Sequence, residues 1–218
     1  MTQQTLYKTA NKNRLGEMGK LAPEAFKGFV GFNKEALSAG NLSAKLKELI
    51  AVAVAHTTGC AYCIDTHVKQ AKALGMTKEE MAEVILVATA LKAGAALAHG
   101  VNALNAYDQI EDEELYKASY INRLPEFLEI NETAFKAFLT FDKEAMRRGL
   151  LSVKEKELIA VAVAHTTGCP YCIDIHVKGA KRAKATKEEL AESILVATAL
   201  KAGSALAHGV NALEAYDS

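Results

Sequence analysis

Apolar side chains recur every three or four residues along most of the chain, which is the spacing of one face of an α-helix. A clear example lies between Pro23, which suits the first turn of a helix, and Gly40, which suits a position beyond its end. The apolar face of that segment consists of Phe26, Phe29, Val30 and Leu37. Alternation of β-branched and polar residues is absent, and helix-favouring Ala, Leu, Lys and Glu predominate. We therefore predict an all-α fold.

The helical pattern occurs twice, at an offset of 109 residues. Residues 44–108 and 153–217 agree at 52 of 65 positions, and weaker similarity extends upstream of both. We predict two tandem repeats, 1–109 and 110–218, joined at the acidic stretch 111–114. Two copies of this length are too few for a solenoid. The repeats are therefore expected to pack as a pseudo-dimer related by a two-fold axis.

Capping signals predict where helices begin within each repeat. Ser43 can cap the helix that carries the apolar run to Ala55. A capping box, in which Ser or Thr is followed three residues later by Glu, occurs at Thr77 with Glu80, Ser152 with Glu155, and Thr186 with Glu189. Residues 95–107 form a last segment rich in Ala and Gly. We expect five or six helices per repeat and no sheet.

Composition and charge indicate a soluble protein. Half of the residues are apolar, about a quarter are charged, and the net charge is zero, so we expect no nucleic-acid or anionic-membrane partner. The first 19 residues lack the apolar core of a signal peptide. The longest apolar runs, 49–55 and 84–91, are too short to span a bilayer. We expect a cytoplasmic location, where a Cys-x-x-Cys pair is more often redox-active or metal-binding than structural.

All four cysteines lie in two copies of one motif, at 56–67 and 165–176. Each copy follows the pattern His-Thr-Thr-Gly-Cys-x-Tyr-Cys-Ile-Asp-x-His. In the second copy Pro170 directly follows the first cysteine, and proline favours the first position of a helix. This places Cys169, and by the repeat Cys60, at a helix N-cap, where the helix dipole stabilises a thiolate.

The second cysteine of each pair, Cys63 or Cys172, lies one helical turn further on. That spacing brings the two Cα atoms to roughly 5–6 Å, within disulfide range. His67 follows Cys63 by four residues, and His176 follows Cys172 in the same way. Each imidazole can therefore hydrogen-bond the sulfur one turn before it and accept the thiol proton. The histidine thus favours the second cysteine as the reactive thiol, whereas the helix dipole favours the first; we adopt the second.

Glu48 and Glu157 stand twelve residues before the first cysteine of their repeats. Both lie on the apolar side of a predicted helix, where a carboxylate needs a partner. His67 and His176 are the candidate partners, which would give a Glu–His–Cys proton relay. An ordinary solvated glutamate near a helix start is the alternative.

The spacing Glu-x11-Cys-x2-Cys-x3-His, complete in both repeats, resembles the core motif of the alkyl hydroperoxidase D family. That family belongs to the carboxymuconolactone decarboxylase-like superfamily. The resemblance implies an all-α fold, a dithiol–disulfide cycle and no metal or cofactor. It also implies that Cys63 and Cys172 attack a peroxide, that Cys60 and Cys169 resolve the disulfide, and that the Glu–His pairs relay protons.

Further expectations from the resemblance concern partners. Three chains associate in such proteins, so we expect a homotrimer. No glycine-rich phosphate loop or flavin fingerprint is present. Electrons must then come from an external dithiol of the lipoamide type or from a protein such as a peroxiredoxin. Lactone decarboxylation is the least expected activity, because true decarboxylases of the superfamily generally lack the cysteine pair.

One position departs from the family pattern. The residue before the second cysteine is Tyr62 or Tyr171, where a well-studied member has a histidine. A tyrosine, with a pKa of about 10, donates a hydrogen bond but is a poor base at neutral pH. Peroxide reduction and general dithiol–disulfide exchange therefore both stay open for this chain.

Zinc binding is the main alternative, because two histidines and two cysteines of each motif resemble a four-ligand set: His56, Cys60, Cys63 and His67 in the first repeat. On one continuous helix they would span roughly 16 Å, too far for one ion. A bend at Gly59 could still permit three ligands. We interpret His56 and His165 as helix C-terminal caps or supporting groups. A non-catalytic redox sensor or scaffold is the second alternative.

Overall fold

The computed structural model describes residues 7–217, which form helices and connecting turns, without a strand in that range. The first repeat contains η1 (Thr9–Arg14), α1 (Leu15–Leu21), α2 (Pro23–Leu37), α3 (Ala44–Thr58), α4 (Ala61–Ala73) and α5 (Lys78–Tyr107). The second contains η2 (Ala118–Arg123), α6 (Glu126–Ile130), α7 (Glu132–Met146), α8 (Val153–Thr167), α9 (Pro170–Arg182) and α10 (Lys187–Asp217). The all-α prediction, with six helical elements in each repeat, is confirmed.

The helices begin where the capping signals predicted. Ser43 accepts the backbone N–H of Leu46 at the start of α3. Both halves of the predicted capping boxes form at Thr77 and at Ser152. Pro23 occupies the first turn of α2. These caps satisfy backbone groups that would otherwise be left unpaired at the helix ends.

The alanine-rich segment 95–107 is the second half of a 30-residue helix, α5, and α10 repeats this with 31 residues. Glycines within α5 permit close packing: a Cβ on Gly100 would lie 2.6 Å from the ring of Phe127. Length and composition alone would let α5 and α10 cross a membrane, with mean hydropathies of 1.7 and 1.4 over their most apolar windows. The prediction from sequence considered only the runs 49–55 and 84–91, and so did not identify these two longer apolar helices. Core helices of soluble proteins pass the same test.

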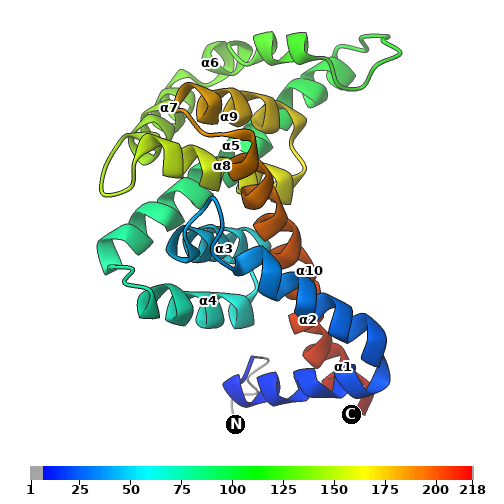
Figure 1. Ribbon diagram of the computed structural model, residues 1–218. Helices are drawn as coiled ribbons and strands as arrows, with labels where there is room; N and C mark the ends of the chain where they lie inside the picture. The colour runs from blue at the N-terminus through cyan, green and yellow to red at the C-terminus, as the bar shows by residue number, and fades with distance from the viewer. Residues whose placement is uncertain (1–6, 218) are drawn as a thin grey trace, which may run out of the picture.

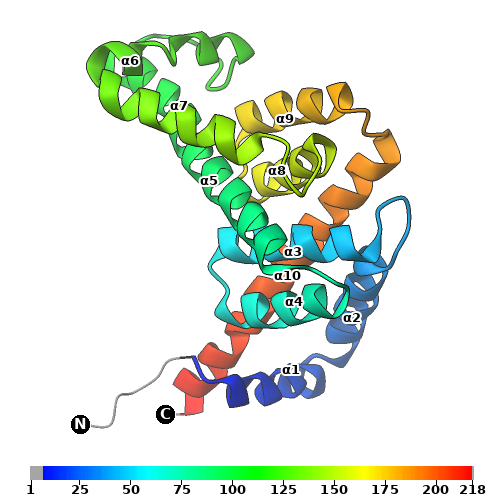
Figure 2. The same cartoon turned by 90° about the vertical axis from the view of Figure 1, so that its left-hand side faces the viewer.

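The two repeats exchange helices. Figures 1 and 2 show α5 and α10 extending from the middle of the molecule to opposite ends. There α10 packs against α1 and α2 of the first repeat, and α5 packs against α7 of the second. In the middle α3, α5, α8 and α10 pack together, and residues of both repeats share one hydrophobic core. The predicted boundary at 109/110 therefore separates two copies in sequence that are interlocked in space.

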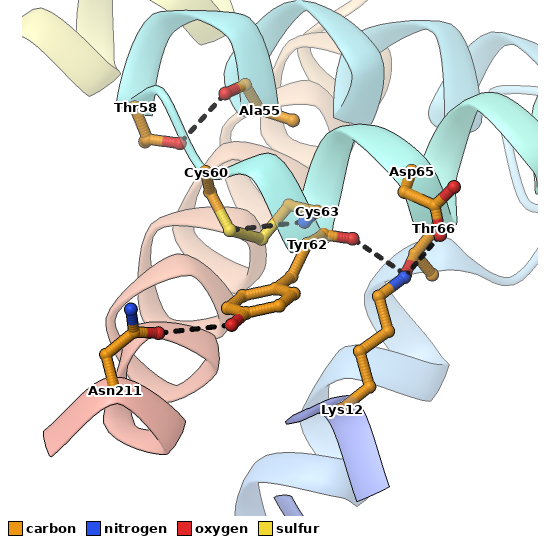
Figure 3. Close-up of a disulfide and its surroundings, with 9 residues drawn as sticks. All are labelled: Lys12, Ala55, Thr58, Cys60, Tyr62, Cys63, Asp65, Thr66 and Asn211. Atoms are coloured by element: carbon orange, nitrogen blue, oxygen red, sulfur yellow. Dashed lines mark hydrogen bonds and ion pairs between the residues drawn. A yellow bond between two sulfur atoms is a disulfide. The ribbon is translucent and has the colours of Figure 1, made fainter. Parts of the chain in front are cut away.

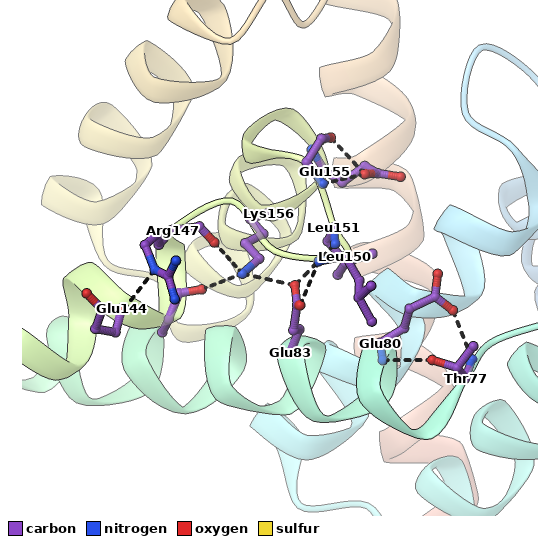
Figure 4. Close-up of polar contacts among 11 residues, drawn as sticks. Thr77, Glu80, Glu83, Glu144, Arg147, Leu150, Leu151, Glu155 and Lys156 are labelled. Carbon is purple, nitrogen blue, oxygen red and sulfur yellow. Dashed lines mark hydrogen bonds and ion pairs between the residues drawn. The ribbon is translucent and has the colours of Figure 1, made fainter.

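Two glutamates, Glu83 and Glu192, tie the repeats together; we call them the bridging glutamates. The Glu83 carboxylate on α5 accepts the backbone N–H groups of Leu150 and Leu151 at 2.8 and 3.2 Å. It also lies 3.0 Å from the buried ammonium of Lys156 (Figure 4). Glu192 on α10 holds residues 41–42 and the ammonium of Lys47 in the same way. Glu83 of α5 thus binds the loop before α8 and α8 itself. Glu192 of α10 binds the loop before α3 and α3 itself.

Candidate active site

Each cysteine pair begins a helix, as predicted. α3 ends at Gly59 in the left-handed conformation, with φ of 71°, and α8 ends in the same way at Gly168. Glycine adopts this conformation without the steric cost that a Cβ would bring. The turn makes Cys60 the N-cap of α4, where its Sγ accepts the N–H of Cys63 at 3.2 Å (Figure 3). In α9 the sulfur of the N-cap cysteine accepts the equivalent N–H at 3.3 Å.

The same geometry holds both redox states of the couple. Cys60 and Cys63 form a disulfide, with their Cα atoms 5.2 Å apart. Cys169 and Cys172 are free, buried thiols at equivalent positions. A helix N-terminus that accommodates both the disulfide and the dithiol suits a pair that cycles between them.

Burial and hydrogen bonds separate the roles of the two thiols in the reduced site. The pKa of the Cys169 thiol falls from 9.0 to about 6, because it accepts hydrogen bonds from the Cys172 side chain and backbone. The pKa of Cys172 is raised, because it donates to the neighbouring sulfur and is buried. The first cysteine is therefore the more readily ionised of the two, as the N-cap position predicted.

A buried carboxylate–imidazole pair accompanies each cysteine pair. Nδ1 of His67 on α4 lies 2.8 Å from Oε2 of Glu48 on α3. In the second repeat His176 and Glu157 are 2.9 Å apart. The side chains of the first pair are only 10% and 8% exposed. Each glutamate thus has the buried partner expected for it, and a solvated position is ruled out. Nδ1 is committed to the carboxylate, which leaves Nε2 for other contacts.

The expected hydrogen bond from imidazole to sulfur is not formed. Within residues 7–217 neither His67 nor His176 hydrogen-bonds a cysteine. Instead Cys63 and His67 both line one cavity of about 170 Å³, to which Cys60 does not contribute. The structure thus brings the Cys63 sulfur and the His67 imidazole to one cavity without a direct hydrogen bond between them.

Both repeats build that cavity. The lining comes from η1, α1, α2 and α4 of the first repeat and from α10 of the second. It is mainly apolar and includes Leu15, Phe29, Leu200, Leu206, Ala207 and Val210. Gly203 on α10 faces the Phe29 ring of α2, since a Cβ placed there would lie in ordinary contact with that ring at 3.5 Å. Because of the helix exchange, α10 of the second repeat forms one wall of the cavity at the first site.

The two tyrosines, which sequence analysis singled out as supporting groups, bridge the repeats. The hydroxyl of Tyr62 donates to Oδ1 of Asn211 on α10 at 3.2 Å (Figure 3). Tyr171 donates to Asn102 on α5 at 3.1 Å. Burial raises the pKa of Tyr171 above its ordinary value. The tyrosines are thus held as hydrogen-bond donors beside the cysteines, and neither asparagine was identified from sequence.

The outer histidines of the motifs lie away from the sulfurs. Nδ1 of His56 lies 2.8 Å from the carbonyl oxygen of Val52, one turn earlier in α3, and His165 makes the same contact in α8. Each of these imidazoles is thus bonded within its own helix, and their role as caps or supporting groups stays a prediction. In the described part of the chain no three His, Cys, Asp or Glu side chains gather in the way that a metal site requires.

Sequence analysis also missed groups that reach the sites from other helices. Lys12 of η1 lines the cavity of the first site and donates to Asp65 and Thr66 at 2.6 and 2.9 Å. Asn33 lines the same cavity. His99 of α5 acts electrostatically on Cys169 of the other repeat. The only available signal was the 109-residue offset, which does not show that α5 and α10 pack against the other repeat.

The fold and the site together define a class of all-helical proteins in which two interlocked repeats each carry one Cys-x-x-Cys site. The sequence model of the Carboxymuconolactone decarboxylase family matches residues 23–106 and again 132–215. The chain therefore belongs to this family, with two tandem copies of its unit, and the family resemblance seen in the motif is confirmed. Membership indicates an enzyme.

Known relatives match single repeats. Over 81 residues the chain is 51% identical to the Paracoccus denitrificans protein named "Uncharacterized protein 4 in cox locus", covering 37% of this chain and 73% of the relative. Over 96 residues it is 40% identical to an uncharacterized protein of Haemophilus influenzae, covering 44% and 85%. Both relatives are thus about as long as one repeat.

A solved structure matches the whole arrangement. It is the crystal structure of a Burkholderia xenovorans LB400 protein provisionally named a gamma-carboxymuconolactone decarboxylase subunit. The TM-score is 0.70 at 23% identity, covering 95% of this chain and 94% of that one. At this identity the match shows the fold alone.

Proposed function

We propose that this protein is a thiol-dependent peroxidase and disulfide reductase that uses its two Cys-x-x-Cys pairs. The observation that carries the proposal is the cavity in which Cys63 meets the imidazole of the buried Glu48–His67 pair. A reactive sulfur, a group that can hold a proton and a space for substrate are thereby brought together. The second repeat carries the same residues.

The proposed cycle balances with a hydroperoxide as oxidant. The Cys63 thiolate attacks one peroxide oxygen, the O–O bond breaks, and the alcohol leaves with one proton, so that Cys63 becomes a sulfenic acid. The sulfur of Cys60 then attacks that of Cys63, forming the disulfide and releasing water. An external dithiol reduces the disulfide and is itself oxidised, which restores both thiols.

Each part of the site has a role in this cycle. Cys63 attacks because it lines the cavity, whereas Cys60 is fully buried at the N-cap and serves as the resolving thiol. In the reduced second site the pKa of Cys169 is lowered by hydrogen bonds from Cys172, which supports a readily ionised first cysteine as the resolving thiol. The Glu48 carboxylate orients His67, which takes the thiol proton and returns it to the leaving oxygen.

The cavity favours a substrate with an apolar body. Its lining is largely aliphatic and aromatic, and its volume of about 170 Å³ suits a small organic hydroperoxide or disulfide. Reduction of such a substrate draws electrons from an external dithiol, of the lipoamide type or on a partner such as a peroxiredoxin. We further propose a cytoplasmic homotrimer as the working form.

The test is peroxide-dependent oxidation of dihydrolipoamide by the full chain. Cys63→Ser with Cys172→Ser should abolish it, because both attacking sulfurs are lost. The matched control is Lys72→Ala with Lys181→Ala, an exposed pair at equivalent positions of α4 and α9. Activity that survives the double cysteine change would refute the assignment.

Two further measurements separate the alternatives. Turnover with a small disulfide but with no peroxide would restrict the function to dithiol–disulfide exchange. One equivalent of zinc per repeat, together with unreactive thiols, would favour a structural metal site over a redox site. Complete inactivity with both substrate classes would favour a sensor or scaffold.

A further inference from the structure

We propose that the two dithiol sites of one chain are not equivalent, and that Asp142 makes Cys172 slower to react than Cys63. The inference rests on the proposed function for its biological meaning, because it concerns the same sites. It is tested on thiol reactivity alone and therefore does not depend on finding the substrate.

Asp142 occupies the position that Asn33 holds in the first repeat, 109 residues earlier. Asn33 on α2 lines the cavity with Cys63 and His67. α7 packs on α5 as α2 packs on α10. A Cβ placed on Gly94 would lie 3.6 Å from the Phe138 ring, and one placed on Gly203 would lie 3.5 Å from the Phe29 ring. The helix exchange therefore brings Asp142 to the second site as it brings Asn33 to the first.

The surroundings of Asp142 are those of the site. It is half-buried, and the groups that act on it electrostatically are Glu157 from α8 and His176 from α9. Cys172, also on α9, in turn senses the charge of Asp142. Among the described residues α5, which packs along α7, adds no charge to this set. No hydrogen bond or ion pair within residues 7–217 engages the carboxyl group.

An additional carboxylate beside a thiol opposes formation of the thiolate. Burial and the neighbouring Glu157 raise the pKa of Asp142, while His176 opposes the shift. The hydrogen bond to the Cys169 sulfur and burial raise the pKa of Cys172 most, and the Asp142 charge adds to them. The first of these is absent when Cys169 is replaced. Since the thiolate is the nucleophile, Cys172 reacts more slowly than a cysteine that has an amide at this position.

A second difference lies in the lining of the first site. Lys12 lines the cavity there, and the second repeat has Ile121 at the equivalent position. The Lys12 ammonium is paired with Asp65 at 2.6 Å, so its charge is largely compensated. The exchange of an amide for a carboxyl group at Asn33 and Asp142 is therefore the difference that favours the thiolate in the first site.

The experiment compares the two thiols within one reduced, full-length chain. Cys60→Ser with Cys169→Ser leaves one cysteine per site, and mass spectrometry of the two peptides follows their alkylation by iodoacetamide from pH 6 to pH 9. We expect Cys63 to react about tenfold faster than Cys172 near pH 7, because a like charge that raises a thiol pKa by about one unit lowers the thiolate fraction about tenfold.

Reciprocal substitutions test the cause. Asp142→Asn should speed labelling of Cys172 about tenfold and lower the pH at which it is half-maximal, and Asn33→Asp should slow Cys63 by the same factor. Glu144→Gln, an exposed charge on the same helix, should change neither rate. If Asp142 had a purely structural role, Asp142→Asn would leave the pH at half-maximal labelling of Cys172 unchanged.

The inference is overturned if Asp142→Asn leaves the Cys172 profile unchanged in a folded protein, or if Glu144→Gln shifts it equally. Asn33→Asp gives an independent measurement should the first variant fail to fold. If the swaps change labelling but the chain shows no peroxidase or disulfide reductase activity, the proposed function fails while this inference stands.

Discussion

Glu192→Gln should destabilise the protein by about 3 kcal/mol at pH 7. The Glu192 carboxylate lies 2.9 Å from the ammonium of Lys47, whose side chain is only 4% exposed. It also accepts the backbone N–H groups of Asn41 and Leu42 at 2.7 and 3.0 Å. Glutamine can still accept a hydrogen bond from the backbone, but it removes the counter-charge of a buried ammonium.

Two routes to the magnitude agree. Burial alone would raise the pKa of Glu192, but the N–H groups of residues 41–42 and the Lys47 ammonium outweigh it and lower the pKa from 4.5 to about 2. That difference corresponds to about 3 kcal/mol at neutral pH, an upper value because solvent partly screens a side chain that is 18% exposed. Removing one partner of a buried ion pair costs about 3–5 kcal/mol.

The pH dependence follows from the lowered pKa of Glu192. A carboxyl group that ionises more easily in the folded state stabilises fully above its unfolded pKa of 4.5. The contribution declines as pH falls from 4.5 to about 2, and is lost below that. The difference in unfolding free energy between wild type and Glu192→Gln should therefore fall to about half at pH 3.

Urea unfolding followed by circular dichroism at pH 7, 5, 4 and 3 measures this difference. Glu132→Gln is the control, since Glu132 pairs with Lys136 on the exposed surface of α7 and should contribute less than about 0.5 kcal/mol. A difference below about 1 kcal/mol at pH 7, or one that stays constant down to pH 3, would refute the reasoning.

Three further predictions test the site and the assembly. Glu48→Gln in a Cys172→Ser background should lower peroxide-dependent dithiol oxidation about 100-fold in steady-state assays, because His67 loses its carboxylate; an unchanged rate would contradict the relay. Tyr62→Phe should cost about 1 kcal/mol in urea unfolding through loss of the hydrogen bond between repeats, and no loss would contradict that bond. Leu86→Glu with Leu195→Glu, which charges exposed apolar positions of the two long helices, should convert the expected homotrimer to smaller species in light scattering.

Local sequence signals predicted the parts of each site that lie within one or two adjacent helices. Pro170 indicated the N-cap, and the twelve-residue spacing of Glu48 from Cys60 placed a carboxylate on the apolar side of α3. Such signals work because caps, turns and helical periodicity depend on neighbours in the chain. The pairing of Glu48 with His67 was predicted because a buried carboxylate needs a partner, with a solvated glutamate as the alternative.

Contacts between repeats could not be predicted in this way. Two copies with nearly the same sequence present nearly the same surfaces, so α2 could pack on the long helix of either copy without any change in pattern. Only the structure shows that α2 packs on α10. It also shows that Tyr62 hydrogen-bonds Asn211 of α10 and not Asn102 of α5. The predicted hydrogen bond from histidine to sulfur was wrong for a related reason. Spacing places His67 on the same face of α4 as Cys63, but the contact with Glu48 sets the orientation of the imidazole ring.

The exchange also explains why two copies in one chain can diverge. α2 and α7 each complete a site that faces the other repeat's long helix, so a change in one of them alters one site and leaves the other intact. Asn33 and Asp142 show such a change, as do Lys12 and Ile121. A protein with a single repeat would change both sites of a symmetric dimer at once. Fusion into one chain removes that constraint, and the two sites are then free to serve different substrates or different pH ranges while sharing one core.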